Sequence, residues 1–315
     1  YSAKLVCFIF SFYSVVIFAA DYGTRKNDAP PGCSQQGNGP VECPNGLTLN
    51  WGDTIANTKA STIIITGNAN LQNATISGGV AIIVNNGDLA AGYGFSTDGS
   101  LEVSNTISFG GNNTVTGDIS AANLIASGGS NHNYLGNVSV TSSFTGGYDT
   151  SIGGDLSGGN ITTASRTAIA GSITGNNITL NSQNNVGGNI SGNSVITNSN
   201  VRIDGTVTAN GVTIGSANTV GGAVNGVGFV QLEPSNSSFS GNISSNGDIF
   251  IGSNNTVVGD ISGADVSTDS PVTLDGNVNA TGNFDLASGS QVNGNVTAVN
   301  VTIRASNSEV DGNVT

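Results

Sequence analysis

The sequence predicts an all-β fold, a single-stranded parallel β-helix (β-solenoid) with 17–19 residues in each coil. Three observations predict it: glycine recurs at that spacing from Gly99 to Gly312, an aliphatic residue stands two positions after each of these glycines, and apolar residues alternate with polar ones in short runs. Alternation with period two is typical of strands with one buried face, and such short runs bury enough apolar surface only when neighbouring repeats stack. Crossover preference favours a right-handed coil.

Inside the coil, we expect equivalent aliphatic residues to form ladders along the axis. The expected core ladder in the second half of the chain consists of Ile173, Ile190, Val207, Val224, Ile243, Ile261, Val278, Val296 and Val314. A second apolar position precedes each repeat glycine by two residues, and a third apolar pair follows it, as in Ile178 and Leu180. The glycine between two inward-pointing residues indicates a corner where a Cβ would clash or need a disfavoured φ. An antiparallel sandwich would instead show hairpin signals every 8–12 residues.

The N-terminal residues predict export. Lys4 precedes an apolar run from Leu5 to Ala20, and Ile17-Phe18-Ala19 has the small-residue pattern of a cleavage site, so residues 1–20 are expected to be a signal peptide. The run of some 16 residues is shorter than the roughly 20 that span a bilayer, and no later segment is expected to span one. Because the chain has no Met and ends at Thr315 inside a repeat, we expect it to be a fragment cut at both ends.

Residues 21–59 are expected to form an N-terminal cap, and residues 60–315 the solenoid, whose repeats between Ala60 and Asp98 have a poorer phase. In an oxidising compartment, Cys33 and Cys43 are expected to form a disulfide, while Cys7 would leave with the signal peptide. A zinc site would need two further ligands, and none is near these cysteines in the sequence. Asn- and Ser-rich tracts, such as Ser253-Asn254-Asn255, are expected at turns, where Asn tolerates left-handed geometry.

Composition excludes several classes of function. The formal net charge is −13, and after Lys59 the only cations are Arg166, Arg202 and Arg304, too few for a nucleic-acid groove. His132 is the one histidine, and its Asn-rich surroundings predict a solvent-exposed turn. The chain is therefore expected not to be an enzyme and to have no catalytic, cofactor-binding or metal-binding site.

The residues disfavour three further kinds of site: a calcium site, a polysaccharide-degrading active site and an ice-binding face. Asp118, Asp155 and Asp260 follow repeat glycines, but the nonapeptide of calcium-binding β-rolls does not recur, so they are expected to be structural turn carboxylates. Asp149, Asp155 and Arg166 lack a partner set on the next coil that would favour a polysaccharide-degrading β-helix enzyme. An ice-binding Thr ladder is disfavoured because Asn, Ser and Asp interrupt the Thr positions. The side chains expected to fill the core, rather than to stack on sugars, include Phe229, Phe239, Phe250 and Phe284.

The coil consensus resembles known repeats. Residues 294–303, with the sequence GNVTAVNVTI, resemble the coils of bactofilins, which form polymerising β-helices. The segment from Asn45 to Ile55, with the preceding Cys33 and Cys43 and the later coils, more closely resembles MshQ-like exported repeat proteins of mannose-sensitive haemagglutinin biogenesis and related agglutinin-type proteins of Gram-negative bacteria. That second resemblance implies a surface or pilus-associated structural protein.

Together these observations predict an exported, non-enzymatic β-solenoid that serves as a rigid stalk or adhesive segment associated with pili. Its expected location is secreted or at the cell surface, on the outer surface or in the periplasm of a Gram-negative bacterium. The expected partners are cell-surface glycans or pilus components, together with end-to-end self-association. The alternatives are a polymer-forming bactofilin-like scaffold and a carbohydrate-active β-helix enzyme.

Overall fold

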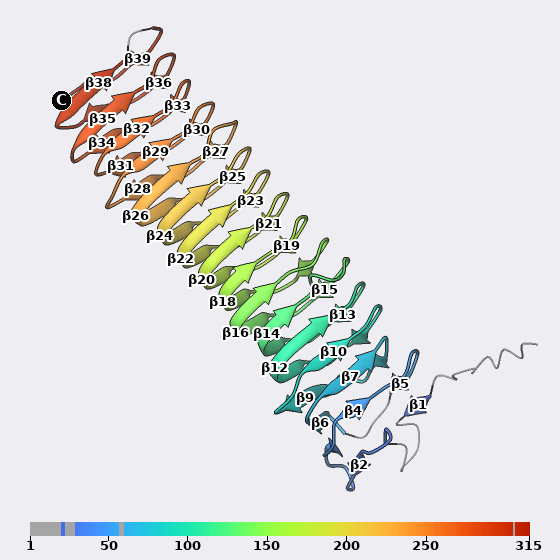
Figure 1. Ribbon diagram of the computed structural model, residues 1–315. Helices are drawn as coiled ribbons and strands as arrows, with labels where there is room; N and C mark the ends of the chain where they lie inside the picture. The colour runs from blue at the N-terminus through green and yellow to red at the C-terminus, as the bar shows by residue number, and fades with distance from the viewer. Residues whose placement is uncertain (1–19, 23–28, 57–59, 305) are drawn as a thin grey trace, which may run out of the picture.

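The computed structural model describes residues 20–22, 29–56, 60–304 and 306–315. Among these residues every regular element is a β-strand, and the strands stack into a long rod (Figure 1). Apart from the antiparallel pair β2–β3, the pairings between strands are parallel and link one coil to the next. The prediction of an all-β parallel solenoid is confirmed.

Two sheets run the length of the rod. The first contains 16 short strands, one per coil. They are β1 (Asp21–Tyr22), β5 (Thr54–Ile55), β8 (Thr75–Ile76), β11 (Ser96–Thr97), β13 (Thr114–Val115), β15 (Asn133–Tyr134), β17 (Ser151–Ile152), β19 (Ala168–Ile169), β21 (Asn185–Val186), β23 (Arg202–Ile203), β25 (Thr219–Val220), β27 (Ser238–Phe239), β30 (Thr256–Val257), β33 (Thr273–Leu274), β36 (Gln291–Val292) and β39 (Glu309–Val310).

The second sheet contains 23 strands, because most coils contribute one long strand and others contribute two short ones. They are β2 (Ser34–Gln35), β3 (Val41–Cys43), β4 (Leu47–Thr48), β6 (Thr62–Thr66), β7 (Ala69–Gln72), β9 (Ala81–Asn85), β10 (Leu89–Ala91), β12 (Leu101–Phe109), β14 (Ile119–Ile125), β16 (Val138–Thr145), β18 (Leu156–Thr162), β20 (Ile173–Leu180), β22 (Ile190–Thr197), β24 (Val207–Ile214), β26 (Val224–Leu232), β28 (Ile243–Ser245), β29 (Ile249–Ile251), β31 (Ile261–Gly263), β32 (Val266–Thr268), β34 (Val278–Ala280), β35 (Asn283–Leu286), β37 (Val296–Thr297) and β38 (Asn300–Ile303).

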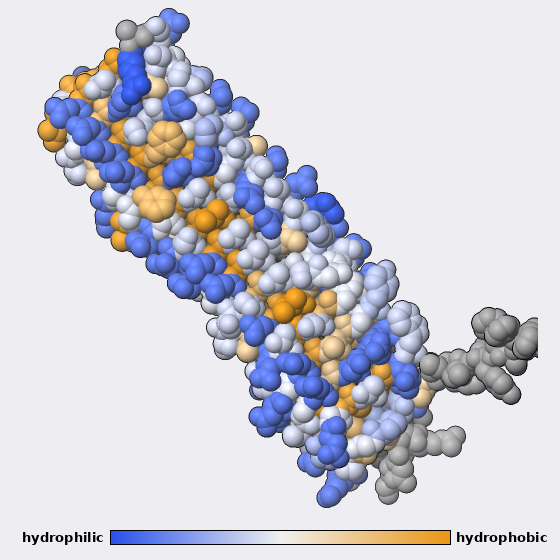
Figure 2. All heavy atoms as spheres, in the orientation of Figure 1, coloured by the Kyte–Doolittle hydropathy of each residue, from blue (hydrophilic) through white to orange (hydrophobic). Residues whose placement is uncertain are grey.

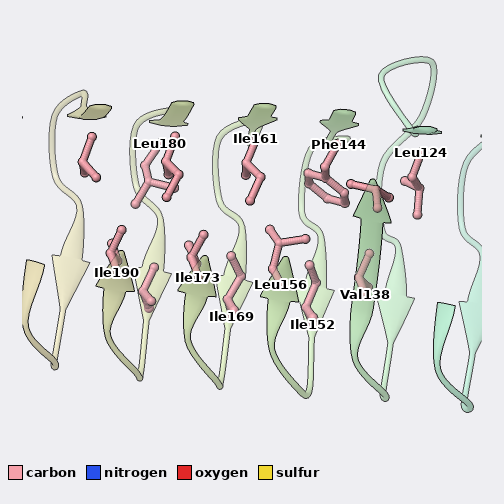
Figure 3. Packing of buried hydrophobic residues seen from close by; sticks show 14 of the residues in the cluster. Leu124, Val138, Phe144, Ile152, Leu156, Ile161, Ile169, Ile173, Leu180 and Ile190 are labelled. Atoms are coloured by element: carbon pink, nitrogen blue, oxygen red, sulfur yellow. The ribbon is translucent and has the colours of Figure 1, made fainter. Parts of the chain in front are cut away.

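The expected core ladder lies in register along the second sheet. Ile173 pairs with Ile190, Val278 with Val296, and Val296 with Val314. Figure 3 shows Leu156, Ile173 and Ile190 at the same height in successive coils, with the V-x-G residues Ile152 and Ile169 beside them. Every member of the ladder from Ile173 to Val296 is at most 1% exposed. Dry, interlocking columns of β-branched side chains therefore form the core.

The repeat glycines are required by close approach of the backbones. A Cβ on Gly205 would lie 2.5 Å from the carbonyl oxygen of Gly188, and one on Gly294 would lie 2.3 Å from that of Gly276. Neither glycine has a φ in the left-handed region. Of the two reasons considered from the sequence, the clash is the one that applies.

Most coils turn through a left-handed residue just before their short strand. Asn200, Ala217 and Asn254 have φ values of 59°, 56° and 60°, as expected for the Asn- and Ser-rich tracts. The residue after it points inward and is polar in many coils. Asn218, for example, is 1% exposed. It accepts a hydrogen bond from the Val201 N–H at 2.6 Å and donates to the Thr197 hydroxyl at 2.7 Å, so this corner has its polar groups satisfied.

Coil stacking begins before Ala60, inside the segment expected to be a cap. β3 pairs in parallel with β6, and β5 pairs with β8, so residues 41–55 already form a coil. In front of it, β2 pairs antiparallel with β3, and a disulfide joins Cys33 to Cys43 with a Cα–Cα distance of 4.2 Å. The cover over this end is therefore a small cross-linked hairpin. Of the expected signal peptide, residues 1–19 lie outside the described residues.

The expectations about three residues, His132, Phe229 and Phe250, were wrong. His132 is 1% exposed, not in solvent, because it occupies the inward position after the left-handed Asn131. Phe229 is 46% exposed on β26, where its ring packs beside Gly211, the glycine at the same register position of β24. Phe250 is half-buried, whereas Phe239 and Phe284 are fully buried as expected.

The stacked core predicts a large difference between inward and outward positions of one strand. I190A removes three methyl or methylene groups from a closed ladder and is expected to lower the free energy of unfolding by about 2–5 kcal/mol. S191A, on the exposed face of β22, is the matched control and is expected to change it by less than about 0.5 kcal/mol. Denaturant unfolding followed by circular dichroism measures both. Equal effects of the two substitutions would contradict the assignment of the faces.

Candidate functional site

The carboxylates considered as candidate metal or catalytic groups are part of a structural ladder. In most coils the residue after the repeat glycine accepts a hydrogen bond from the backbone N–H of the equivalent residue on the next coil. Asp118 accepts from Asn137 at 2.7 Å, Asp155 from Ser172 at 2.7 Å, and Asp260 from Asn277 at 2.8 Å. Asn side chains play the same role elsewhere, as between Asn189 and Thr206. An amide oxygen serves as well as a carboxylate, so this position needs an acceptor and no negative charge.

The arginines after Lys59 are each engaged by a carboxylate. Arg166 donates two hydrogen bonds to Asp149, at 2.6 and 2.8 Å, and Arg202 and Arg304 contact Asp204 and Asp285, each at 2.6 Å. The hydrogen bonds from Arg166 hold the pKa of Asp149 below its ordinary value, so this carboxylate is ionised at neutral pH. All three arginine side chains are more than half exposed, where ion pairs contribute little stability.

The described residues contain no cluster of three or more His, Cys, Asp or Glu side chains that could hold a metal ion. A shallow cavity lies in the N-terminal hairpin and is lined by Ser34, Gln36, Gly39, Pro40 and Glu42. Glu42 is the one titratable group in that lining. The prediction that the chain is not an enzyme stays a prediction.

One edge of the rod carries a row of exposed aromatic side chains that the sequence analysis missed. These side chains stand three positions before the short strands β5, β11 and β17, which stack in register along the first sheet. Trp51, Tyr93 and Tyr148 occupy this row and are 63%, 61% and 53% exposed. The signal in the sequence was their separation by whole numbers of coils, two between Trp51 and Tyr93 and three between Tyr93 and Tyr148.

Beyond Tyr148 the same row is occupied by serine in every described coil. Its members are Ser165, Ser182, Ser199, Ser216, Ser235, Ser253, Ser270, Ser288 and Ser306. The Arg166 guanidinium lies 5.9 Å from the centroid of the Tyr148 ring, at the boundary between the two parts. We call Trp51, Tyr93 and Tyr148 the aromatic row.

The last coil that the structure describes contains β38 and β39, whereas β37 is already followed by Val314, which pairs with Val296. β38 pairs with β35 and β39 pairs with β36, and within the described residues neither has a second neighbour. The last members of the three ladders, Val301, Val310 and Val314, are consequently half-buried or exposed, while their equivalents one coil earlier, such as Val296, are fully buried.

Comparison with known protein families gives a match for the C-terminal part of the chain. Residues 212–315, the C-terminal third of the chain, match the family model described as bactofilin, polymer-forming cytoskeletal. No curated protein and no solved structure matches the chain. The resemblance of the coils to bactofilins is thus supported for this segment, whereas the resemblance to MshQ-like exported proteins is unconfirmed. No helix in the described part of the chain is long and apolar enough to cross a membrane.

The family match corrects the expected function. The expectation of an exported adhesive stalk associated with pili was wrong, because the matched family is polymer-forming and cytoskeletal. The match supports the alternative, a bactofilin-like polymer-forming scaffold, and agrees with the expected self-association. The expected location outside the cytoplasm stays a prediction. The C-terminal third of this chain is therefore similar to the bactofilins.

Proposed function

We propose that the protein is a subunit of a bactofilin-like polymer in which solenoids stack end to end. The observation that carries the proposal is that residues 212–315 match a polymer-forming family and consist of coils that stack in one register through β35, β36, β38 and β39. A solenoid grows by adding coils, each of which contacts only its neighbours. A coil of a second subunit that stacks in register on the end of the rod makes the same kinds of contact as an internal coil.

The sides of the rod offer a weaker basis for assembly. Figure 2 shows polar residues over most of the visible side, with apolar residues forming a broken line. The charge of −13 also makes side-by-side contact of two copies repulsive at low ionic strength. Growth along the axis adds backbone hydrogen bonds and apolar ladder contacts at each junction, so the axial direction is favoured.

The proposal predicts that a charge at the end of a ladder blocks assembly. In the 315-residue chain, V301D places a carboxylate where Val301 would meet a second copy of that chain. Burying it unpaired costs more than about 1.4 kcal/mol, so the concentration needed for assembly should rise at least about tenfold. Sedimentation and negative-stain electron microscopy of the protein across a concentration series measure this.

The matched control is T297D, which adds the same charge to an exposed outward position of the same coil. It is expected to leave assembly nearly unchanged, and hydrogen exchange in residues 173–280 should be the same in all three proteins. Assembly of V301D at the concentration that suffices for the wild-type protein would contradict the end-to-end arrangement. A wild-type protein that stays monomeric at every concentration would contradict the proposed polymer.

A second candidate function is favoured by the aromatic row. We propose that Trp51, Tyr93 and Tyr148 contact a linear polysaccharide lying parallel to the rod axis. Coils repeat about every 4.8 Å, so the three rings follow one another at roughly 10 and 14 Å along one edge. Exposed Trp and Tyr combine an apolar face with a polar group, which suits stacking against sugar rings. The proposal concerns a contact only and is independent of assembly.

The single tryptophan gives a direct readout of this contact. Titration with cellohexaose and chitohexaose is expected to change Trp51 fluorescence saturably, and Y93A with Y148A should weaken binding at least about tenfold, since each lost stack removes about 1 kcal/mol. F229A removes an exposed aromatic ring on another face and should leave binding unchanged. An unsaturable response, or equal weakening by F229A, would rule out the row as the contact.

A further inference from the structure

The core contains a small group of polar atoms without partners. Both ring nitrogens of His132 and the hydroxyl of Tyr134 are buried, and none of the three has a hydrogen-bond partner. The His132 ring stacks on that of Tyr134, with ring centroids 5.8 Å apart. The ring of Phe109, from β12 on the preceding coil, has its centroid 6.3 Å from that of His132. Buried polar atoms are nearly always paired in folded proteins, so this cluster is exceptional.

The register of the coils shows what is unusual about His132. In the preceding coil the equivalent residue is Asn113, which accepts a hydrogen bond from the Phe95 N–H at 2.8 Å. In the following coil it is Thr150, whose hydroxyl donates to the Gly147 carbonyl at 2.8 Å. In these neighbouring coils a short polar side chain makes a hydrogen bond to a backbone group at the corner. His132 places a titratable ring in the same position and makes no such bond.

The coil is enlarged to hold this ring. Residues 126–132 connect β14 to β15, whereas residues 181–184 make the equivalent connection between β20 and β21. The wider loop stands above the strand of Leu124 in Figure 3. On the next coil, a Cβ at Gly147 would lie 2.6 Å from the Ala126 carbonyl oxygen and 2.7 Å from both the Gly129 carbonyl oxygen and His132 Cδ2. A glycine is therefore needed there to make room for the loop and the imidazole together.

The surroundings of the ring provide no compensating charge. Residues 109–116, 126–135 and 145–153 form the packed coil segments, and besides His132 their titratable groups are Tyr134, Tyr148 and Asp149. Burial raises the pKa of Tyr134 well above its ordinary value, so that hydroxyl stays neutral. Tyr148 is 53% exposed at the edge of the rod, and Asp149 is paired with Arg166. A proton on His132 would therefore create a buried cation that faces the backbone carbonyls of Ala126 and Gly129 but no carboxylate.

We propose that His132 makes this coil an acid-sensitive joint of the rod: protonation of the imidazole opens residues 126–152 while the coils on either side stay stacked. Burial lowers the pKa of folded His132 below 6.5, and the nearby carbonyls of Ala126 and Gly129 oppose this only in part. The open coil binds a proton near pH 6.5 and the closed coil binds it less readily. Stability of the coil is therefore complete above pH 6.5 and falls as the pH drops below that value.

The first test uses the fact that His132 is the one histidine of the chain. In proton NMR of the untagged protein, the imidazole signal is expected not to shift around pH 6.5 and to broaden or shift only at lower pH. Hydrogen exchange of residues 126–152, corrected for intrinsic rates, should be up to about 30-fold faster at pH 5.0 than at pH 7.5. That limit applies when the open coil titrates at 6.5 and the closed imidazole stays neutral.

The second test replaces the ring by the side chain that other coils use. H132N is expected to abolish the acid-dependent increase in exchange across residues 126–152, because Asn at this position accepts a backbone hydrogen bond in other coils and does not titrate. D149N, which removes the nearest carboxylate but leaves the ring, is expected to retain the acid dependence. A wild-type imidazole that titrates at 6.5 without local opening, or an acid response that persists in H132N, would overturn the proposal.

Discussion

The structure depends on one constraint, the register that stacks each residue on its equivalent in the coils before and after it. Parallel pairing holds Ile173, Ile190 and Val207 in one column, so each side chain has to fit two copies of a similar side chain. Aliphatic residues can stack in this way over any number of coils, because each coil adds the same dispersion contacts and removes the same kind of apolar surface from water. The same register brings the backbones so close at the corners that only glycine fits, as at Gly205.

Polar groups obey the same rule, which explains how so weakly charged a chain folds. An Asx or Ser side chain on one coil satisfies the backbone of a neighbouring one, both outside, as with Asp155 and Ser172, and inside, as with Asn218 and Val201. These bonds need acceptors and donors but no net charge. His132 departs from this pattern, since its position is polar in neighbouring coils but its ring is left without a partner. A position where the ladder fails is where we expect the rod to open first.

The periodic features were predictable from the sequence, because a residue's place in the period is enough to assign its face. The core ladder and the turn asparagines follow from spacing alone. His132 was misassigned since its neighbours Asn131 and Asn133 suggested a polar loop, whereas its register with Asn113 and Thr150 decides its burial. Phe229 was misassigned for the opposite reason: its type suggested the core, but its position on β26 faces outward. The aromatic row could be predicted only by comparing residues that lie several coils apart in the sequence. The adhesive function was wrong because coil repeats of different families share composition.

The central claim is that coils stack in register within a subunit and continue across the junction between subunits. X-ray diffraction from aligned filaments of the protein tests it most directly. Strands that run across the axis and repeat at every coil predict a strong reflection near 4.8 Å along the filament axis. A filament whose 4.8 Å reflection lies perpendicular to its axis would show that the rods join by their sides, and would contradict the account.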